Sequence, residues 1–269
     1  MKIGFIGAGS MGAMLVRALV RAAAINPAEI WISNRSRDKL EQLTAEVPGI
    51  QTGENADVAR ECQVIFLCVK HTDTESAVHS MRGELRGDQL LVTLAGPVAF
   101  TWLESRVSCR VAKIVPAVTQ EALKGACLVT WGSRITEQDV ATLRGLLERI
   151  SVPVIVPEEH RRACATLASA GPAFVAWMLG AMAEAACASQ PGLAPEIATE
   201  LARGMAIGTA ALLSDQGWTF DAIVRRVATP GGMTERGIEV LSEHIPPVWR
   251  RLFDELAQRE MALREKLTA

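Results

Sequence analysis

Three glycines near the N-terminus constrain the fold of this chain more than any other feature. Gly7, Gly9 and Gly12 follow a short apolar segment and precede a run with helical periodicity, so they form the pattern GxGxxG between a strand and a helix. The first glycine permits a tight turn, the second lets a pyrophosphate approach the backbone, and the third allows close helix packing. We therefore expect a dinucleotide at this loop, although a glycine-rich turn without a ligand would show the same pattern. The loop residues expected to bind it are Gly7, Ala8, Gly9, Ser10, Met11 and Gly12.

Strand and helix patterns alternate up to about Pro157, and only helical patterns follow. The expected strands are residues 2–6, 30–33, 64–69, 90–94, 110–115, 126–130 and 154–156. The expected helices are residues 11–24, 36–45, 75–81, a helix ending at 150 with Thr136 and Asp139 as its cap, and then 158–187, 194–214, 219–227, 231–241 and 245–266. This order predicts an α/β fold, in which a Rossmann-type, doubly wound and mostly parallel sheet over residues 1–157 precedes an all-helical domain over residues 158–269.

The segment after the second expected strand indicates which dinucleotide binds. NAD enzymes of this fold usually place an acidic residue there to bind the ribose 2′-hydroxyl. This chain has Asn34, Arg35, Ser36 and Arg37 instead. A guanidinium, an amide and a hydroxyl can bind a 2′-phosphate that an acid would repel, so we favour NADP(H) over NAD. The alternative is a solvated helix start in which Ser36 caps the helix and the arginines point into water.

Composition excludes several classes of partner. The chain has 28 basic and 30 acidic residues and a net charge of −2, which is not the electrostatic footprint of a nucleic-acid-binding protein. Its six cysteines lack CxxC spacing, which is typical of reduced thiols in a cytoplasmic protein.

Residues 163–183 carry no charge, but they are rich in Ala and Gly and contain Gly171-Pro172, so we expect a helix at a packed interface and no membrane span.

The residues that are missing also exclude several chemistries. The chain has no tyrosine, so no mechanism can use a tyrosine as acid or base. No lysine occurs between Lys124 and Lys266, which argues against the helical-domain lysine of β-hydroxyacid dehydrogenases. The four histidines lack ligand spacing, and we therefore expect no metal site.

A second glycine loop lies between two expected helices near the C-terminus. It reads Thr229-Pro230-Gly231-Gly232-Met233-Thr234. Consecutive glycines let neighbouring backbone N–H groups point into one concavity, which suits a small carboxylate. A simple connection between two helices, punctuated by Pro and Gly, would have the same composition.

Taken together, these motifs resemble the pyrroline-5-carboxylate reductase family, and the resemblance covers essentially the whole chain. Its most specific part is Pro230-Gly231-Gly232-Met233-Thr234, which is similar to the family's SPGG[TA]T signature. The other matching positions are the first glycine loop, Asn34-Arg35-Ser36, Asn55, Val69-Lys70, Ala95-Gly96 and Gly171-Pro172-Ala173-Phe174.

The resemblance implies an enzyme that reduces the cyclic imine 1-pyrroline-5-carboxylate to L-proline with NAD(P)H. It implies that backbone N–H groups of Gly231, Gly232, Met233 and Thr234 hold the substrate carboxylate, and that the Thr234 hydroxyl bonds the ring nitrogen. Asn55, Val69, Lys70, Ala95 and Gly96 would then contact the cofactor. It also implies pairing of two chains, as a homodimer or a higher oligomer, through the helical domain.

Some positions depart from the family pattern. His71 replaces the proline of "VKP", Ala117 replaces the asparagine of "MPN", Ala168 and Ala170 stand in "SGSGPAY", and Thr229 replaces the serine of SPGG. Similar changes occur in reductase-like paralogues such as the late-competence proteins. Two hypotheses therefore stand: a reductase of pyrroline-5-carboxylate or a related cyclic imine, and an NADP-binding protein with a regulatory or competence-type role.

Overall fold

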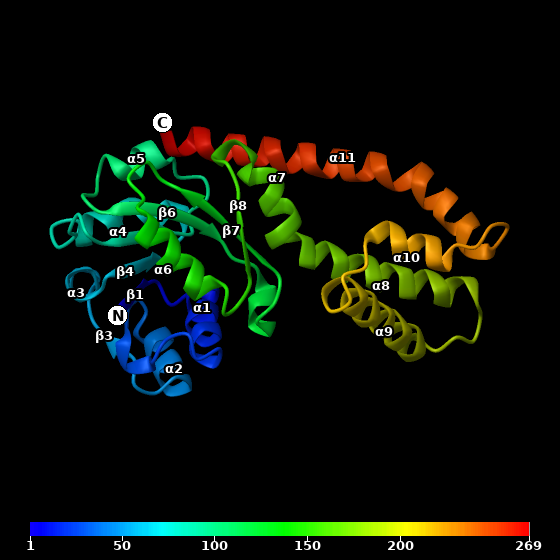
Figure 1. The fold of residues 1–269 in the computed structure, drawn as a ribbon, viewed down its shortest axis with the longest axis horizontal. Helices are drawn as coiled ribbons and strands as arrows, with labels where there is room; N and C mark the ends of the chain where they lie inside the picture. The colour runs from blue at the N-terminus through cyan, green and yellow to red at the C-terminus, as the bar shows by residue number, and fades with distance from the viewer. Residues whose placement is uncertain (269) are drawn as a thin grey trace. The chain divides into compact units, whose positions relative to one another are not determined.

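The computed structural model describes residues 1–268, and its first part is an eight-stranded sheet with helices on both faces (Figure 1). The strand order is β3-β2-β1-β4-β5-β6-β7-β8, and all neighbouring strands are parallel except β6 and β7. The strands are β1 (Ile3–Ile6), β2 (Ile30–Ser33), β3 (Gln51–Thr52), β4 (Val64–Leu67), β5 (Leu90–Thr93), β6 (Arg110–Val115), β7 (Ala126–Trp131) and β8 (Val152–Ile155). The predicted doubly wound, mostly parallel sheet is confirmed, and its winding reverses at β1 and β4, where such folds bind ligands.

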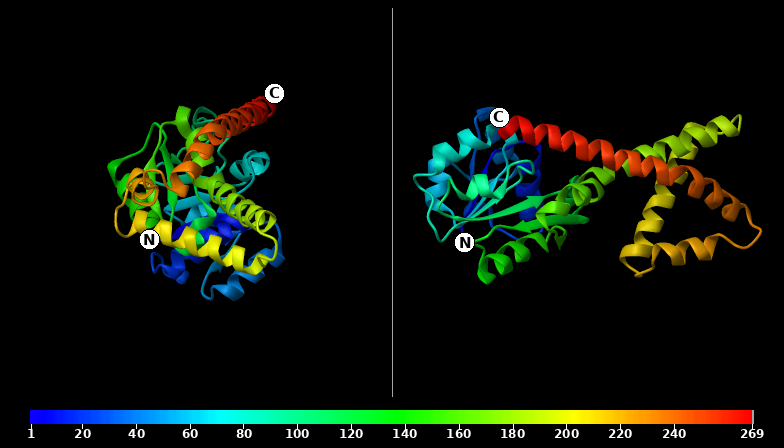
Figure 2. Two further views of the ribbon diagram at one scale, coloured as in Figure 1. Left: turned by 90° about the vertical axis from the view of Figure 1, so that its right-hand side faces the viewer. Right: turned by 90° about the horizontal axis from the view of Figure 1, so that it is seen from above.

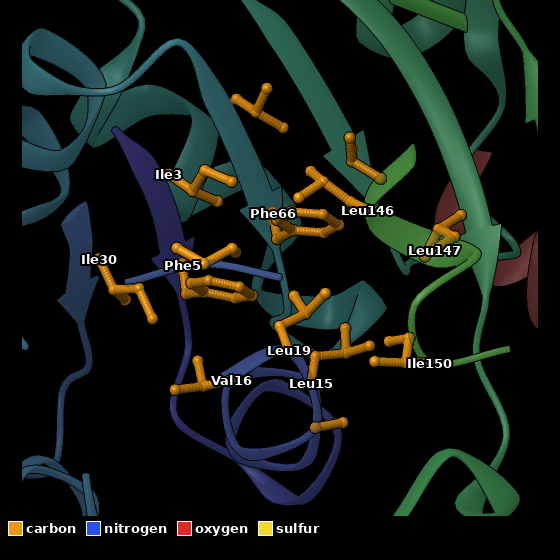
Figure 3. Close-up of a cluster of buried hydrophobic side chains, with 14 of the residues drawn as sticks. Ile3, Phe5, Leu15, Val16, Leu19, Ile30, Phe66, Leu146, Leu147 and Ile150 are labelled. Atoms are coloured by element: carbon orange, nitrogen blue, oxygen red, sulfur yellow. The ribbon is translucent and has the colours of Figure 1, made fainter. Parts of the chain in front are cut away.

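The two faces of the sheet bury separate apolar clusters. One face is covered by α1 (Ser10–Arg21), α2 (Arg37–Glu46) and α6 (Glu137–Leu147), and the other by α3 (Asn55–Glu61), α4 (Thr74–Met81) and α5 (Phe100–Glu104). On the first face Phe5 of β1 and Phe66 of β4 stack with ring centroids 4.9 Å apart, close to Leu15 and Leu19 of α1 (Figure 3). Burial of these rings fixes β1 against β4 and α1 against both strands.

The start of α6 confirms a cap that the sequence predicts. The Asp139 backbone N–H donates to the Thr136 hydroxyl oxygen at 3.3 Å, and the Thr136 backbone N–H donates to an Asp139 carboxylate oxygen at 2.9 Å. This reciprocal pair is a capping box, which satisfies two backbone donors that the first helical turn leaves free.

Helices alone follow β8. They are a short 3₁₀ turn (Glu158–His160), α7 (Arg161–Ala165), a π-helical turn (Thr166–Ala170), α8 (Gly171–Ser189), α9 (Pro195–Ser214), α10 (Phe220–Val227) and α11 (Met233–Thr268). The chain divides into two compact units, one of Met1–Ala170 with the C-terminal end of α11 from residue 257, and one of Gly171–Leu256. The domain boundary between residues 157 and 158 stays a prediction, and Ala269 lies outside the described residues.

The prediction of two helices at residues 231–241 and 245–266 is wrong, because α11 is one continuous helix. Pro246 and Pro247 lie inside it, although proline lacks the N–H of the helical ladder and normally ends a helix. The part of α11 that follows the prolines makes tertiary contacts in each of the two units. Trp249 lies 6.5 Å from the Phe174 ring within the second unit, and Glu260 forms ion pairs within the first.

The second unit leaves much apolar surface uncovered in a single chain. Helices α8 and α9 belong to the helical second part of the chain (Figure 2). They pack against one another through small residues, Ala183, Ala198 and Ala202. Seven large apolar side chains of these two helices are exposed: Val175, Trp177, Met182, Ile197, Leu201, Met205 and Ile207. In the described residues, one helical stretch, Glu158–Ser189, is long and apolar enough to cross a membrane, and only 11% of its most apolar window is buried. Length and composition alone are weak support for a span, since an interface helix passes the same test.

Candidate functional site

The turn from β1 into α1 brings three chain segments into close contact. Gly7 has a φ of +106°, and a Cβ there would lie 2.8 Å from the Cys68 carbonyl oxygen at the end of β4. A Cβ on Gly12 would lie 2.1 Å from the Gly7 carbonyl oxygen, so α1 packs directly on the turn. Neither position accepts a side chain without moving backbone, because left-handed φ and such contacts favour glycine.

Gly9 differs from the other two glycines, because a Cβ built on it meets no heavy atom of the described residues within 4 Å. The fold therefore does not require a glycine here. Gly9 occupies the N-cap position of α1 without a side-chain cap, and the first turn of that helix has no acidic residue. Free N–H groups and the helix dipole make this open space suitable for an anion such as a pyrophosphate.

A cavity of about 380 Å³ opens beside this turn, at the carboxyl ends of β1, β2 and β4. It brings together these expected cofactor residues: Gly7, Gly9, Asn34, Arg35, Asn55, Val69 and Lys70. Ala8 and Ser10 line a smaller hollow on the other side of Gly9, next to Arg17 and Lys39. Met11, Gly12, Ser36, Ala95 and Gly96 line neither space.

Two of the residues expected to bind the cofactor, Asn34 and Asn55, form hydrogen bonds within the protein. The Asn34 amide oxygen accepts from the Ala8 backbone N–H at 3.0 Å, and its nitrogen donates to the Ser36 carbonyl oxygen at 3.0 Å. The Asn55 amide accepts from the Ser33 hydroxyl and donates to the Ser80 hydroxyl at 2.8 Å. Both asparagines thereby fix the walls of the cavity. Ser36 occupies the N-cap position of α2, but its hydroxyl makes no cap hydrogen bond. The structure therefore does not support the alternative in which Ser36 caps this helix.

Two cations line the cavity near the start of α2. The Arg35 side chain is 85% exposed, and its guanidinium lies 3.1 Å from an Asp73 carboxylate oxygen, while Lys39 stands one turn into the helix. An exposed ion pair of this kind contributes little energy, so Arg35 remains able to exchange Asp73 for a phosphate. Sequence reasoning missed Lys39, Asp73, Ser76 and Ser80. For Lys39 a signal was available, because it follows Arg35 and Arg37 in the sequence. Asp73, Ser76 and Ser80 lie on a different chain segment, and no sequence signal linked them to this cavity.

The Ala95-Gly96 turn follows β5 and is shaped by an arginine from α7. The Ala95 N–H donates to the Thr93 hydroxyl at 3.1 Å, and the Gly96 N–H donates to the Leu94 carbonyl oxygen at 2.9 Å. A Cβ on Gly96 would lie 2.6 Å from the Arg161 Nη1 atom. Gly96 is therefore needed for the close approach of a buried guanidinium.

The second glycine loop, in the second unit, already binds a carboxylate of its own chain. The Gly231 N–H donates to the Glu235 carboxylate at 2.7 Å, and the Gly232 N–H donates to the Thr229 carbonyl oxygen at 2.9 Å. Gly231 has a left-handed φ of +74°, which favours glycine. Gly232 is constrained by space instead, since a Cβ there would lie 2.7 Å from the Thr229 hydroxyl. Met233 and Thr234 begin α11 and are exposed.

Cysteine or metal chemistry has no support at these sites. All six cysteines are free, and burial raises the pKa of Cys62 to about 12, of Cys109 to about 11 and of Cys127 to about 12. Burial also raises the pKa of the Cys68 thiol beside the glycine loop. These thiols stay protonated at neutral pH and are poor nucleophiles. Over residues 1–268, no group of three or more His, Cys, Asp and Glu side chains is arranged to hold a metal ion.

The fold and the cavity define a class, an NADP-dependent oxidoreductase built on a Rossmann-type sheet. Residues 2–97 match the family model "NADP oxidoreductase coenzyme F420-dependent", and residues 158–263 match "Pyrroline-5-carboxylate reductase dimerisation". The chain belongs to the pyrroline-5-carboxylate reductase family, whose members act on C=N bonds, and the second match supports association of identical chains.

Two relatives illustrate the range of this family. The chain is 31% identical to ComE operon protein 4 of Bacillus subtilis, over 94% of this chain and 93% of the relative. It is 28% identical to pyrroline-5-carboxylate reductase 3 of the same organism, over 99% and 97% of the two chains.

Solved structures share the fold over the full length. A pyrroline-5-carboxylate reductase from Coxiella burnetii aligns with a TM-score of 0.85 and 24% identity, covering 99% of this chain and 98% of that one. The Plasmodium falciparum pyrroline carboxylate reductase, solved with NADP bound, aligns with a TM-score of 0.81 and 17% identity over 100% and 98%.

The different surroundings of Gly9 and Gly12 give a matched pair of variants. Gly9→Ala should leave the melting temperature unchanged and abolish NADPH binding, because its methyl group enters only the space kept open for phosphate. Gly12→Ala should lower the melting temperature, because its methyl group meets the Gly7 carbonyl oxygen. Thermal unfolding and NADPH titration measure both effects. Undiminished NADPH binding by Gly9→Ala would show that the phosphates lie elsewhere.

The exposed apolar side chains of α9 give a second prediction. The native protein should have a mass of at least twice the 28.9 kDa of one chain, and Leu201→Glu should shift it toward 28.9 kDa. Glu200→Gln changes the neighbouring exposed position and should leave the mass unchanged. Light scattering in dilute neutral buffer measures all three. A mass of about 28.9 kDa for the unmodified protein would contradict an interface on these helices.

Proposed function

We propose that this protein reduces 1-pyrroline-5-carboxylate, or a closely related cyclic imine carboxylate, with NADPH, and that L-proline is the product of the first substrate. The observation that carries the proposal is the second glycine loop, in which a backbone N–H bonds a carboxylate at 2.7 Å and a threonine follows three residues later. The names of several relatives, pyrroline-5-carboxylate reductase, agree with this substrate class.

In this proposal the substrate carboxylate takes the place of the Glu235 side chain at the loop. The substrate carboxylate would accept the Gly231 hydrogen bond that the Glu235 side chain accepts in the free chain, and the Glu235 side chain would turn toward solvent. The Thr234 hydroxyl, in the first turn of α11, then hydrogen-bonds the ring nitrogen of the substrate. The rigid loop thus fixes two points of a small ring, which is the orientation that a transfer reaction requires.

The cofactor site fits NADPH by the chemistry of its donors. The open space at Gly9 and the N-terminus of α1 suit the pyrophosphate, and Arg35 and Lys39, which line the cavity, suit a 2′-phosphate. Bound NADPH would supply a hydride to the imine carbon. A protonated imine accepts hydride readily, so the chain needs to orient its substrate and does not need a tyrosine or lysine as acid.

The second hypothesis, a regulatory or competence-type NADP-binding protein without proline-forming activity, is favoured by one comparison. ComE operon protein 4 is 31% identical to this chain. His71, Ala117 and Thr229 also depart from the family pattern. Ala117 is fully buried, and its backbone N–H donates to the Gln120 side chain at 3.3 Å. Because alanine replaces the asparagine of the family pattern, this position has no polar side chain. Both hypotheses place the protein in the cytoplasm, where NADPH is available.

One assay separates the two hypotheses. The purified protein is mixed with NADPH and pyrroline-5-carboxylate, and the loss of absorbance of the reduced nicotinamide is followed together with formation of proline. Turnover supports the reductase. Tight NADPH binding without turnover of this imine or of other cyclic imine carboxylates would favour the regulatory role.

The charge at the start of α2 predicts a preference for NADPH over NADH. Arg35→Ala should weaken NADPH binding by roughly 1–3 kcal/mol, the usual range for a charge-assisted contact to phosphate, and change NADH binding less than twofold. Arg37→Ala is the matched control, since Arg37 is exposed and does not line the cavity. Titrations with both cofactors provide the comparison. Equal affinities of the unmodified protein for NADPH and NADH would refute the preference.

The Thr234 hydroxyl gives a prediction for turnover. Thr234→Val should lower kcat with pyrroline-5-carboxylate by tenfold to a hundredfold, which is about 1.5–3 kcal/mol for one lost hydrogen bond. Thr234→Ser keeps the hydroxyl and should retain most of the rate. NADPH affinity should not change in either variant, because the cofactor cavity contains no residue of this loop. A normal rate for Thr234→Val would exclude a catalytic role of the hydroxyl.

A further inference from the structure

Five charged side chains form a connected cluster inside the first unit. Lys113 of β6 lies 2.6 Å from Glu158, and Arg161 of α7 lies 3.6 Å from the same Glu158 oxygen. Arg161 also forms a close ion pair with Glu260, near the end of α11, and Glu260 lies 3.4 Å from Arg162. The signs alternate along the cluster, so each carboxylate lies between two cations.

The centre of this cluster is almost completely withdrawn from water. The side chains of Lys113, Arg161 and Glu260 are 1%, 3% and 8% exposed. Taking charges out of water is costly, and apolar residues of similar size often stabilise a fold at least as well. Stability alone therefore explains the cluster poorly, whereas the fixed geometry of hydrogen-bonded charges suits a role in positioning.

Arg161 contacts one backbone turn with particular closeness. Its Nη1 atom occupies the space that a side chain on residue 96 would need, at 2.6 Å from the position of a Cβ. The Ala95-Gly96 turn lies directly after β5, at the carboxyl edge of the parallel sheet, where folds of this class bind their ligands. The guanidinium thus packs against this turn, and Glu158 and Glu260 form ion pairs with it there.

We infer that Arg161 is a positioning residue for hydride transfer, and that Glu260 acts through it. The charge of Glu260 holds the guanidinium against Gly96. In this proposal the Ala95-Gly96 turn, which lies outside the phosphate-binding cavity, contacts the nicotinamide ring at the edge of the sheet. A contact between residues that are 99 positions apart in the chain thereby links the last helix to the reaction geometry. This inference rests on the proposed function, since it assigns the nicotinamide to the edge beside β5.

The decisive variant is Glu260→Gln, which keeps the shape of the side chain and removes its charge. We expect kcat for imine reduction to fall about tenfold or more, because small displacements of reacting atoms have large effects on rate. The NADPH dissociation constant should change less than twofold, because the phosphate-binding cavity contains none of these residues. Glu159→Gln is the matched control, an exposed glutamate one residue after Glu158, and should leave both quantities unchanged.

Two further measurements keep the inference falsifiable. Gly96→Ala places a methyl group where the guanidinium lies, so this variant should lower kcat by a similar factor even if Glu260→Gln folds poorly. The kcat of the double variant should be little lower than that of either single variant. The fluorescence of bound NADPH reports on the nicotinamide without any turnover, and it should move toward that of free NADPH in both single variants.

These readouts separate the failure of this inference from failure of the proposed function. If the unmodified protein reduces no imine, the proposed function fails, and the fluorescence of bound NADPH still decides the role of Arg161 and Glu260. If Glu260→Gln and Gly96→Ala only lower the melting temperature, with kcat and fluorescence unchanged, the cluster is structural and the inference is wrong.

Discussion

Close backbone contact between the ends of β1 and β4 is the constraint on which the rest of the structure depends. The stacked rings of Phe5 and Phe66 hold the two strands together, and Gly7 and Gly12 allow the chain to turn into α1 within this contact. The same turn leaves the N-terminus of α1 pointing into the cavity that Asn34 and Asn55 enclose. Packing of the sheet and recognition of a dinucleotide are therefore two consequences of one local geometry.

The ion pairs of this protein differ in how far they are exposed to water, and this difference separates their roles. Arg35 and Asp73 form an exposed pair that a phosphate can replace at low cost, whereas Arg161 and Glu260 form a buried pair that resists separation. Glu235 is an intermediate case, a partly exposed carboxylate that accepts a hydrogen bond from the Gly231 backbone N–H. Of these charges, the more exposed ones therefore lie at the two proposed ligand sites, whereas the buried ones lie against the turn that follows β5.

The fold could be predicted from local patterns, and the site only in part. Alternating apolar segments identified the sheet, and Thr136 with Asp139 identified the start of α6. The two-residue strand β3 was missed because both of its residues are exposed, and the break predicted between residues 241 and 245 does not exist, because α11 is continuous there. No local pattern could show that Arg161 meets Glu260 or that Glu235 bonds Gly231, because such contacts depend on tertiary structure and side-chain direction.

We propose that this chain directs hydride from NADPH to the carbon of a cyclic imine held by its carboxylate. The most direct test uses NADPH that carries deuterium at the transferable position, together with unlabelled pyrroline-5-carboxylate. We expect proline with one deuterium on the carbon that was part of the imine, as read by mass spectrometry and NMR. Absence of proline, or proline without deuterium at that carbon, would contradict it.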